Sequence, residues 1–299
     1  MTNIVLLDGG MGQELVARSA NPPSPLWSAN VMMNEPEIVE AVHKDYIAAG
    51  ATVLTLNAYS ATPERLARDA NENLFKPLQA KAIEIVQQAA IDSNITLGGC
   101  LPPLFGSYHP EHAPEFDICL QTYRRVVAEQ KNAMDVLICE TLSSIKEIKA
   151  AVQAGVESGL PVWCGMSAKD EDGTLLRSGE TVAEGANIAK QTGAAAVAIN
   201  CSWPEAVTQA LPDLAKTGLP FGGWANGFTN AAGDLGIGGT VTHMGKRTDL
   251  DPDGYAGHVM NWVDRGATLV GGCCEVGPAH IQKIAQKLQA TGHTLTGNL

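Results

Sequence analysis

Three cysteines are the residues of this chain whose type and spacing could do chemistry. Cys273 and Cys274 are adjacent and follow a pair of glycines, and Cys201 lies upstream, directly after the apolar run 194–200. Each stands at the end of a run that predicts a strand. Three thiolates that the fold brings together can bind zinc and leave its fourth position open, which is typical of a catalytic zinc. We therefore expect a zinc site that activates either a thiol or a water molecule.

An adjacent cysteine pair could also be no more than the buried end of a strand. Neighbouring residues of a regular strand point to opposite faces, so both sulfurs reach one metal only if the chain leaves strand geometry. Gly271 and Gly272 supply that freedom. The glycine pair, the strand-end position and the Cys201 counterpart favour the zinc interpretation. The remaining cysteines lie in apolar runs and are predicted to be small buried hydrophobic residues: Cys100, Cys119, Cys139 and Cys164.

The composition is that of an ordinary globular protein. The 299 residues are 45% hydrophobic and carry a formal net charge of -12, which argues against nucleic acid or an anionic membrane surface as a partner. No apolar run approaches the roughly 20 residues that span a bilayer, and the first residues show no signal-type stretch. The seven cysteines are an odd number spread along the chain, and in a reducing compartment such cysteines are more often buried, catalytic or metal-binding than paired in disulfides. We expect a cytoplasmic monomer or small homo-oligomer that acts on small molecules.

One unit repeats along the chain: a short apolar run, a loop, an amphipathic stretch and a glycine near its end. Eight runs are predicted strands: 4–7, 52–56, 96–99, 136–139, 162–165, 196–199, 221–223 and 268–270. Eight stretches are predicted helices: 36–49, 75–93, 119–133, 145–158, 182–192, 204–216, 254–265 and 278–290. This alternation predicts one α/β domain over residues 1–299, a closed (β/α)8 TIM barrel. A doubly wound open sheet is the alternative, but the glycines after the first strand do not form a G-x-G-x-x-G loop.

Barrel enzymes carry their chemistry at the carboxyl ends of the strands. Polar residues follow the predicted strands at this rim: Asp8, Asn57, Tyr59, Glu140, Cys201, Asn226, Cys273 and Cys274. Two long loops, 101–116 and 227–252, emerge there as well, and loops of this length are usually functional. From this position both loops could cover the site. His109 and His112 lie on the first loop without helical spacing, and we predict that neither binds metal.

The order of these motifs resembles the homocysteine S-methyltransferase family, the zinc-dependent methyltransferases that do not use cobalamin. The matching motifs are Leu7–Gly12 (LDGGMG), Asn57–Thr62 (NAYSAT), Glu140-Thr141, Asn200-Cys201, Gly271–Cys274 (GGCC) and Gly277–Ile281 (GPAHI). The resemblance covers essentially the whole chain, and the combination is highly specific although no single piece is. The stretch Leu26–Ala29 (LWSA), followed by Pro36-Glu37, resembles the branch that uses S-methylmethionine or S-adenosylmethionine.

The resemblance implies that Cys201, Cys273 and Cys274 hold Zn²⁺ and that the sulfur of homocysteine becomes the fourth ligand. Coordination deprotonates a thiol whose free pKa is roughly 8.5, and three cysteinate ligands keep the bound sulfur electron-rich. A cationic donor would then lose a methyl group to this sulfur and form methionine. The transfer itself would need positioning and charge placement rather than a general base.

The resemblance also implies contacts to the amino-acid part of homocysteine. Asp8 and Glu140 would bind its ammonium group, and two carboxylates on one rim suit a cation. Taken alone, Asp8 could be a turn residue and Glu140 a charge at a helix N-terminus. The other predicted substrate contacts are backbone N–H groups after the first strand, which suit a carboxylate, and two rim side chains: Gly9, Gly10, Met11, Asn57 and Tyr59.

Two places depart from the family pattern. Glu275 adds a negative charge after the cysteine pair and could tune the site, contact a cationic donor or form an ion pair outward. The stretch 224–230 differs from the Pro-Asn-x-Gly that usually follows strand seven in the family. The identity of the methyl donor is therefore the property that the resemblance determines least. Within this stretch, Trp224 could offer its ring face to a cationic donor or pack in the core.

A sulfonium donor, S-methylmethionine or S-adenosylmethionine, is the favoured interpretation. A betaine-type donor (glycine betaine or dimethylsulfoniopropionate) and a selenol or other thiol acceptor are the alternatives within the same chemistry. Outside it, the cysteines could serve a zinc-storage or redox-sensing barrel in which the adjacent pair forms a disulfide. A zinc hydrolase is a further alternative, although three thiolates would make bound water a poorer acid.

Overall fold

A computed structural model of the chain describes residues 2–22, 24–26, 28–236, 239 and 244–299. Its centre is a ring of parallel strands, and each predicted strand is present within three residues of its predicted ends. The strands are β1 (Asn3–Leu6), β2 (Val53–Thr55), β3 (Thr96–Leu101), β4 (Val136–Leu142), β5 (Val162–Met166), β6 (Ala196–Asn200), β7 (Phe221–Trp224) and β8 (Leu269–Val270).

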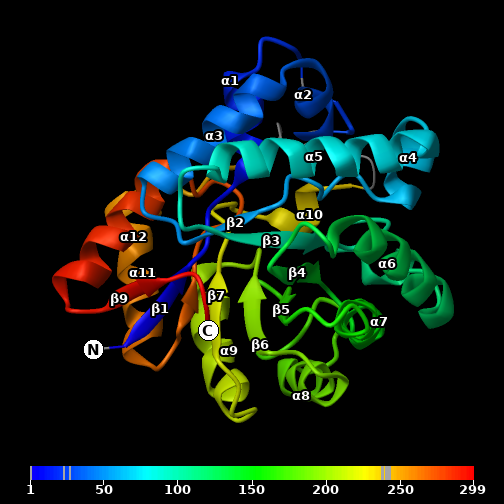
Figure 1. Ribbon diagram of the computed structural model, residues 1–299. Coiled ribbons are helices and arrows are strands. Elements are labelled where there is room, and N and C mark those ends of the chain that lie inside the picture. The colour runs from blue at the N-terminus through cyan, green and yellow to red at the C-terminus, as the bar shows by residue number, and fades with distance from the viewer. Residues whose placement is uncertain (1, 23, 27, 237–238, 240–243) are drawn as a thin grey trace.

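The ring is closed. Neighbouring strands pair in the order β2-β3-β4-β5-β6-β7-β8-β1. The last gap closes between β1 and β2, where Leu7 forms a parallel bridge with Val53 and the Thr52 N–H donates to the Leu6 carbonyl at 2.8 Å. The eight parallel strands with helices packed around them (Figure 1) confirm the predicted (β/α)8 barrel.

The eight predicted helices are also present and cover the outside of the ring. They are α3 (Pro36–Ala48), α5 (Phe75–Ala90), α6 (Phe116–Gln130), α7 (Ile145–Val156), α8 (Val182–Thr192), α9 (Pro204–Ala215), α11 (Pro252–Asp264) and α12 (Pro278–Ala290). Local signals explain their ends, as in α8, where Thr181 and Glu184 form a capping box and Gly193 ends the helix at φ 106°. In the part of the chain that the structure describes, no helix combines the length and the apolar character needed to cross a bilayer.

Several short elements were not predicted. They are α1 (Met11–Arg18), α2 (Ser28–Asn34), α4 (Pro63–Asp69), α10 (Ala231–Asp234), the 3-10 turns η1 (Glu72–Leu74) and η2 (Pro110–His112), and β9 (Thr294–Thr296). Most are only one or two turns long, and this is too short for a helical period to stand out in a sequence. β9 pairs in parallel with the start of β1, opposite the carboxyl ends of the strands.

The interior of the barrel is filled by side chains that alternate along the strands, because residues i and i+2 of a strand point to the same face. These buried residues are Val5, Leu7, Val53, Val136, Ile138, Trp163, Ala196, Ala198, Trp224 and Leu269. Cys273 packs against this cluster. The rim residues therefore lie on a closely packed barrel interior.

Gly222 of β7 allows two strands to approach closely. A Cβ at this position would lie 1.8 Å from the backbone oxygen of Leu269 in β8, and neither strand can move away without breaking ladder hydrogen bonds. We expect Gly222→Ala to lower the free energy of unfolding by about 3 kcal/mol or more. Urea denaturation followed by circular dichroism would measure the change.

Gly257→Ala is the matched control for this prediction. Gly257 lies on the exposed side of α11, and a Cβ there would meet nothing within 4 Å. Because alanine favours a helix by roughly 1 kcal/mol over glycine, this variant should be as stable as the unchanged protein or slightly more so. If Gly222→Ala were as stable as Gly257→Ala, the close strand contact would be wrong.

Candidate active site

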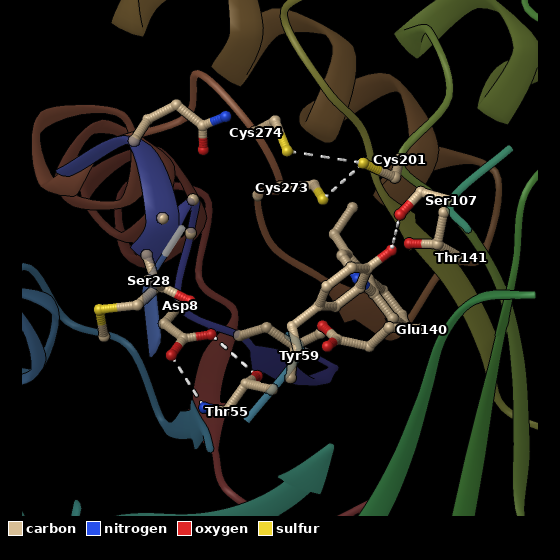
Figure 2. Close-up of a pocket in the computed structure, with 18 of the residues that line it drawn as sticks. Asp8, Ser28, Thr55, Tyr59, Ser107, Glu140, Thr141, Cys201, Cys273 and Cys274 are labelled. Atoms are coloured by element: carbon tan, nitrogen blue, oxygen red, sulfur yellow. Dashed lines mark hydrogen bonds between the residues drawn. The ribbon is translucent and has the colours of Figure 1, made fainter. Parts of the chain in front are cut away.

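A pocket opens at the carboxyl ends of the strands (Figure 2). The ends of β1, β2, β4 and β7 line it, together with the residues that follow β6 and β8. Its remaining wall comes from the segments after β1 and β2, from α1, from the start of the short helix at Ser28–Asn34 and from the two long loops. All of the predicted site residues lie in this wall: Asp8, Gly9, Gly10, Met11, Asn57, Tyr59, Glu140, Cys201, Cys273 and Cys274.

The three cysteine sulfurs converge at one point of the pocket (Figure 2). The Sγ atom of Cys201 lies 2.8 Å from that of Cys273 and 3.8 Å from that of Cys274. All three sulfurs lie within 4.8 Å of one another. Ligands at a Zn–S distance of roughly 2.3 Å are about 3.8 Å apart at the corners of a tetrahedron. Movements of about 1 Å would place the sulfurs at three such corners, so the set fits a zinc ion.

The backbone leaves strand geometry where these cysteines stand. Cys201 has a φ of 49°, a left-handed conformation that is uncommon for a residue other than glycine. β8 ends at Val270, and the chain then folds back so tightly that a Cβ on Gly272 would lie 2.2 Å from Val276 Cγ1. Gly272 is therefore required by close packing. The expected departure from strand geometry at the cysteine pair is present.

The sulfurs share negative charge unequally. Burial acts to raise the pKa of Cys201, but hydrogen bonds with Cys273, Cys274 and Tyr108 outweigh it and hold that pKa well below its usual value. The hydrogen bonds with Cys201 raise the pKa of Cys273 and of Cys274. One thiolate is thus stabilised by two thiols, an arrangement that a metal cation would convert into three thiolate ligands.

Two carboxylates face the same pocket. Asp8 accepts hydrogen bonds from the Thr55 N–H at 2.8 Å and from the Thr55 hydroxyl at 3.0 Å. Glu140 accepts one from the Cys100 thiol at 3.0 Å. Burial raises the pKa of Asp8 to about 8 and that of Glu140 to about 7. A positive charge bound beside them would lower both pKa values, so this part of the pocket favours a cation.

The loop after β1 offers fewer free donors than the sequence suggests. The Gly10 N–H donates to the Val276 carbonyl at 2.9 Å, and the Met11 N–H donates to the Gly9 carbonyl at 2.8 Å. A substrate carboxylate could reach these two N–H groups only in competition with those bonds. The geometry therefore favours other donors for such a carboxylate over Gly10 and Met11.

Asn57 and Tyr59 follow β2 in the pocket wall. The Asn57 side chain is 5% exposed, and its Nδ2 lies 3.9 Å from the Met32 sulfur. The Tyr59 hydroxyl lies 2.8 Å from that of Ser107, and the Arg65 guanidinium stands over the Tyr59 ring at 5.1 Å. Tyr59 is thus held as a fixed aromatic wall.

Tyr108 is the main site residue that sequence reasoning missed. It lies on the loop 101–116, is 6% exposed, and its hydroxyl lies 3.0 Å from the Cys201 sulfur. Length was the only available signal for this loop. Other unpredicted lining residues are Gln13, Ser28, Thr55, Ser107, Phe228 and Leu235.

Both long loops take part in the site, as expected. The loop 101–116 supplies Tyr108, and the loop 227–252 supplies Phe228 and Leu235. The two loops touch where His109 Nε2 lies 2.8 Å from the Leu235 carbonyl oxygen. Residues 237–238 and 240–243 of the second loop lie outside the described residues.

Three further sequence expectations concern the surroundings of the pocket. Glu275 forms an ion pair with Lys246 at 3.1 Å, which is one of the three roles considered for it. Trp224 is buried in the barrel interior, as the packing interpretation expects, and it also lines the pocket; its contact with a cationic donor stays a prediction. Trp27 of the LWSA stretch lies outside the described residues.

The histidines of the first loop stand near a carboxylate. Ligand atoms of His109, Glu111 and His112 lie within 4.8 Å of one another, and His109 Nδ1 lies 2.9 Å from Glu111 Oε1. Glu111 and His112 are exposed. The expectation that these histidines bind no metal stays a prediction.

Comparisons with known proteins agree on one family. A sequence model described as homocysteine S-methyltransferase matches residues 5–288. The homocysteine S-methyltransferase of Escherichia coli (strain K12) is 31% identical over 304 residues, covering 93% of this chain and 93% of that protein. The selenocysteine Se-methyltransferase of Brassica oleracea var. italica is 26% identical over 313 residues, covering 95% of this chain and 89% of that protein.

A solved structure shows the same likeness in three dimensions. The crystal structure of the homocysteine methyltransferase MmuM from Escherichia coli, in its metallated form, matches with a TM-score of 0.77 at 26% sequence identity. The match covers 95% of this chain and 96% of that one. The likeness therefore extends over the whole barrel and is not confined to the motifs at its rim.

Proposed function

This chain belongs to the homocysteine S-methyltransferase family and is a methyltransferase, and from that premise we propose that it transfers a methyl group from a sulfonium donor to the thiolate of homocysteine, forming methionine. The observation that carries the proposal is the convergence of the sulfurs of Cys201, Cys273 and Cys274 in one pocket with the carboxylates of Asp8 and Glu140. We further propose that residues 1–299 act as a single homocysteine-binding barrel whose partners are small molecules.

Cys201, Cys273 and Cys274 would hold the zinc ion, since their sulfurs are soft ligands that already lie within 4.8 Å of one another. When bound, zinc supplies the charge that turns the homocysteine thiol into a thiolate at neutral pH. Asp8 and Glu140 would bind the substrate ammonium group and thereby fix the direction of its side chain. The substrate is then held at both ends, with its sulfur toward the cysteines.

The walls of the pocket favour a cationic methyl donor. Its aromatic lining consists of Tyr59, Tyr108, Trp224 and Phe228. Aromatic ring faces attract a sulfonium or ammonium cation without forming hydrogen bonds to its methyl groups. The three negative charges of the thiolates already exceed the two positive charges of a zinc ion, so the site as a whole attracts positive charge. Transfer of the methyl group discharges the donor, and this favours release of the product.

S-methylmethionine or S-adenosylmethionine is the donor we favour. Glycine betaine and dimethylsulfoniopropionate carry similar cationic centres and are the alternatives. A selenol or another thiol is the alternative acceptor, and the relative named as a selenocysteine Se-methyltransferase supports testing it. A selenolate suits the same three-sulfur site because it is also a soft ligand.

A methyl-transfer assay on reduced, zinc-loaded protein tests the proposal. Homocysteine is the acceptor, the four donors are supplied separately, and methionine and bound zinc are both measured. We expect one zinc ion per chain and methionine from S-methylmethionine or S-adenosylmethionine. Selenocysteine in place of homocysteine then tests the second acceptor. Tightly bound zinc with no methionine from any of the four donors would overturn the proposed reaction but keep the metal site.

A further inference from the structure

Tyr108 lines the pocket and also makes a direct contact with one of the three cysteines. Its hydroxyl lies 3.0 Å from the sulfur of Cys201, and its ring is 6% exposed. The residue has a φ of 67°, a left-handed conformation that costs a non-glycine residue roughly 1 kcal/mol or more. Such a conformation persists when the surroundings hold it, and it is often found at functional sites. Here it aims the tyrosine hydroxyl at one sulfur.

Arg177 holds both partners of this contact. Its guanidinium stands 4.6 Å above the Tyr108 ring, and its Nη2 donates to the backbone oxygen of Cys201 at 3.2 Å. The same group donates to Ser167 Oγ at 2.7 Å and pairs with Asp170 at 3.1 Å, where both side chains are 5% exposed. The rigid, planar Arg177 guanidinium thus contacts both the Tyr108 ring and the Cys201 backbone. It therefore fixes the distance between the Tyr108 hydroxyl and the Cys201 sulfur.

The contact distinguishes Cys201 from the other two cysteines. A metal-bound thiolate has no proton, so Tyr108 must be the donor in this hydrogen bond when the site is loaded. Among the described residues, no hydroxyl hydrogen-bonds to the sulfur of Cys273 or Cys274. A hydrogen bond to a thiolate withdraws electron density from the sulfur and makes it a weaker nucleophile.

A less nucleophilic Cys201 thiolate is an advantage in a site that binds a methylating agent. Every thiolate of the site can in principle attack the donor, because its methyl carbon is electrophilic. In the unwanted reaction the Cys201 sulfur forms a bond to this carbon, the bond from the carbon to the donor sulfur breaks, and its electron pair leaves with the donor as a neutral thioether. Cys201 would become S-methylcysteine, a neutral thioether that is a poor zinc ligand.

We propose that Tyr108, held by Arg177, protects Cys201 from methylation by the donor and so directs the methyl group to the substrate sulfur. The inference rests on the proposed function for the identity of the methylating agent, but the contact it invokes does not depend on which donor is used. Tyr108 and Arg177 are positioning residues in this account, since they act through Cys201.

Tyr108→Phe tests the inference because it removes only the hydroxyl. Zinc-loaded protein is incubated without homocysteine in two arms, one with the active methyl donor and one with iodoacetamide, which alkylates thiolates and loses iodide. Tryptic peptides 191–216 and 266–283 separate Cys201 from the adjacent pair, so mass spectrometry gives the rate of modification for each. We expect Cys201 to be modified about tenfold faster than in the unchanged protein, which equals 1.4 kcal/mol, with the pair unaffected.

Two further variants sharpen the test. Tyr123→Phe removes a buried hydroxyl that donates to the Pro102 carbonyl outside the pocket lining, and it should leave the rate at Cys201 unchanged. Arg177→Lys keeps a charge beside Asp170 but loses the planar contact with the ring. It should raise the rate at Cys201 to a value between those of the unchanged protein and Tyr108→Phe.

Two results would overturn the inference. One is an unchanged Cys201 rate in Tyr108→Phe with zinc retained. The other is an equal rise at all three cysteines, which would show that the hydroxyl only helps to retain the metal. The iodoacetamide arm needs no methyl donor, so it decides the role of Tyr108 even if no methionine is formed, a failure that would count against the proposed function alone.

Discussion

Alanine in place of Cys201, Cys273 or Cys274, one at a time, should abolish zinc retention and reduce methionine formation by at least about a thousandfold. Each substitution removes one of three soft ligands, and without the metal the homocysteine thiol stays largely protonated at neutral pH. The fold should persist, because the three sulfurs form a small cluster at the rim and the barrel interior lies beneath them. Metal analysis, the methyl-transfer assay and circular dichroism together measure these effects.

Cys164→Ala is the matched control for the cysteine variants. Cys164 is fully buried in β5 and is absent from the pocket lining. Its replacement removes a buried sulfur of the same size and should leave one zinc ion and near-normal turnover. If any of the three rim variants turned over like this control, the cysteine mechanism would have to be abandoned.

Glu140→Gln should weaken homocysteine binding by about ten- to a hundredfold while zinc stays bound. The substitution keeps the shape of the side chain but removes the charge of a half-buried carboxylate, and hydrogen bonds to charged groups are worth roughly 1.5–3 kcal/mol. Calorimetric titration with homocysteine, with the zinc content measured in parallel, gives both quantities. The zinc content should not change, because Glu140 is separate from the three sulfurs.

Glu147→Gln is the control for this variant. Glu147 lies on α7, outside the pocket, and is 3% exposed. Its carboxylate accepts a hydrogen bond from the Ser144 hydroxyl at 2.8 Å. Neutralising it should leave the affinity for homocysteine unchanged. If the Glu140 and Glu147 variants bound homocysteine with equal affinity, Glu140 would have only a structural role.

The raised pKa values also give this binding a pH dependence. Burial raises the pKa of Asp8 from 3.8 to about 8 and that of Glu140 from 4.5 to about 7. Protonated carboxyls bind an ammonium group poorly, so homocysteine affinity should rise as the pH passes through 7 and 8. Without homocysteine, the two groups contribute stability that is complete below pH 3.8 and is lost as the pH rises through their folded-state pKa values.

The barrel could be predicted because its signals are local and repeated. Each strand and main helix carries its own apolar period and end signals, and a closed barrel places the carboxyl ends of all strands at one rim. Asp8, Glu140 and the three cysteines could therefore be assigned to one pocket from their positions after predicted strands. The resemblance to a known family added roles that position alone did not give.

The missed features depend on contacts between distant segments. Tyr108 meets Cys201 across 93 residues, and nothing in the loop sequence fixes the backbone conformation that allows it. Arg177 acts through the same contact, so no local pattern identifies it either. The bonds that occupy the N–H groups of Gly10 and Met11 likewise depend on how the chain folds back after β8.

The short strand β9 joins the two ends of the chain into a mechanical clamp. β1 and β9 run in parallel, with Asn3 opposite Thr294 and Val5 opposite Thr296, so the chain leaves this pair in opposite directions. A force that pulls on both ends would load the hydrogen bonds between β1 and β9 in shear, all together, and would not unzip them one by one. The barrel should therefore resist stretching until this clamp ruptures, and its β1–β8 and β1–β2 contacts would be exposed to the force only afterwards.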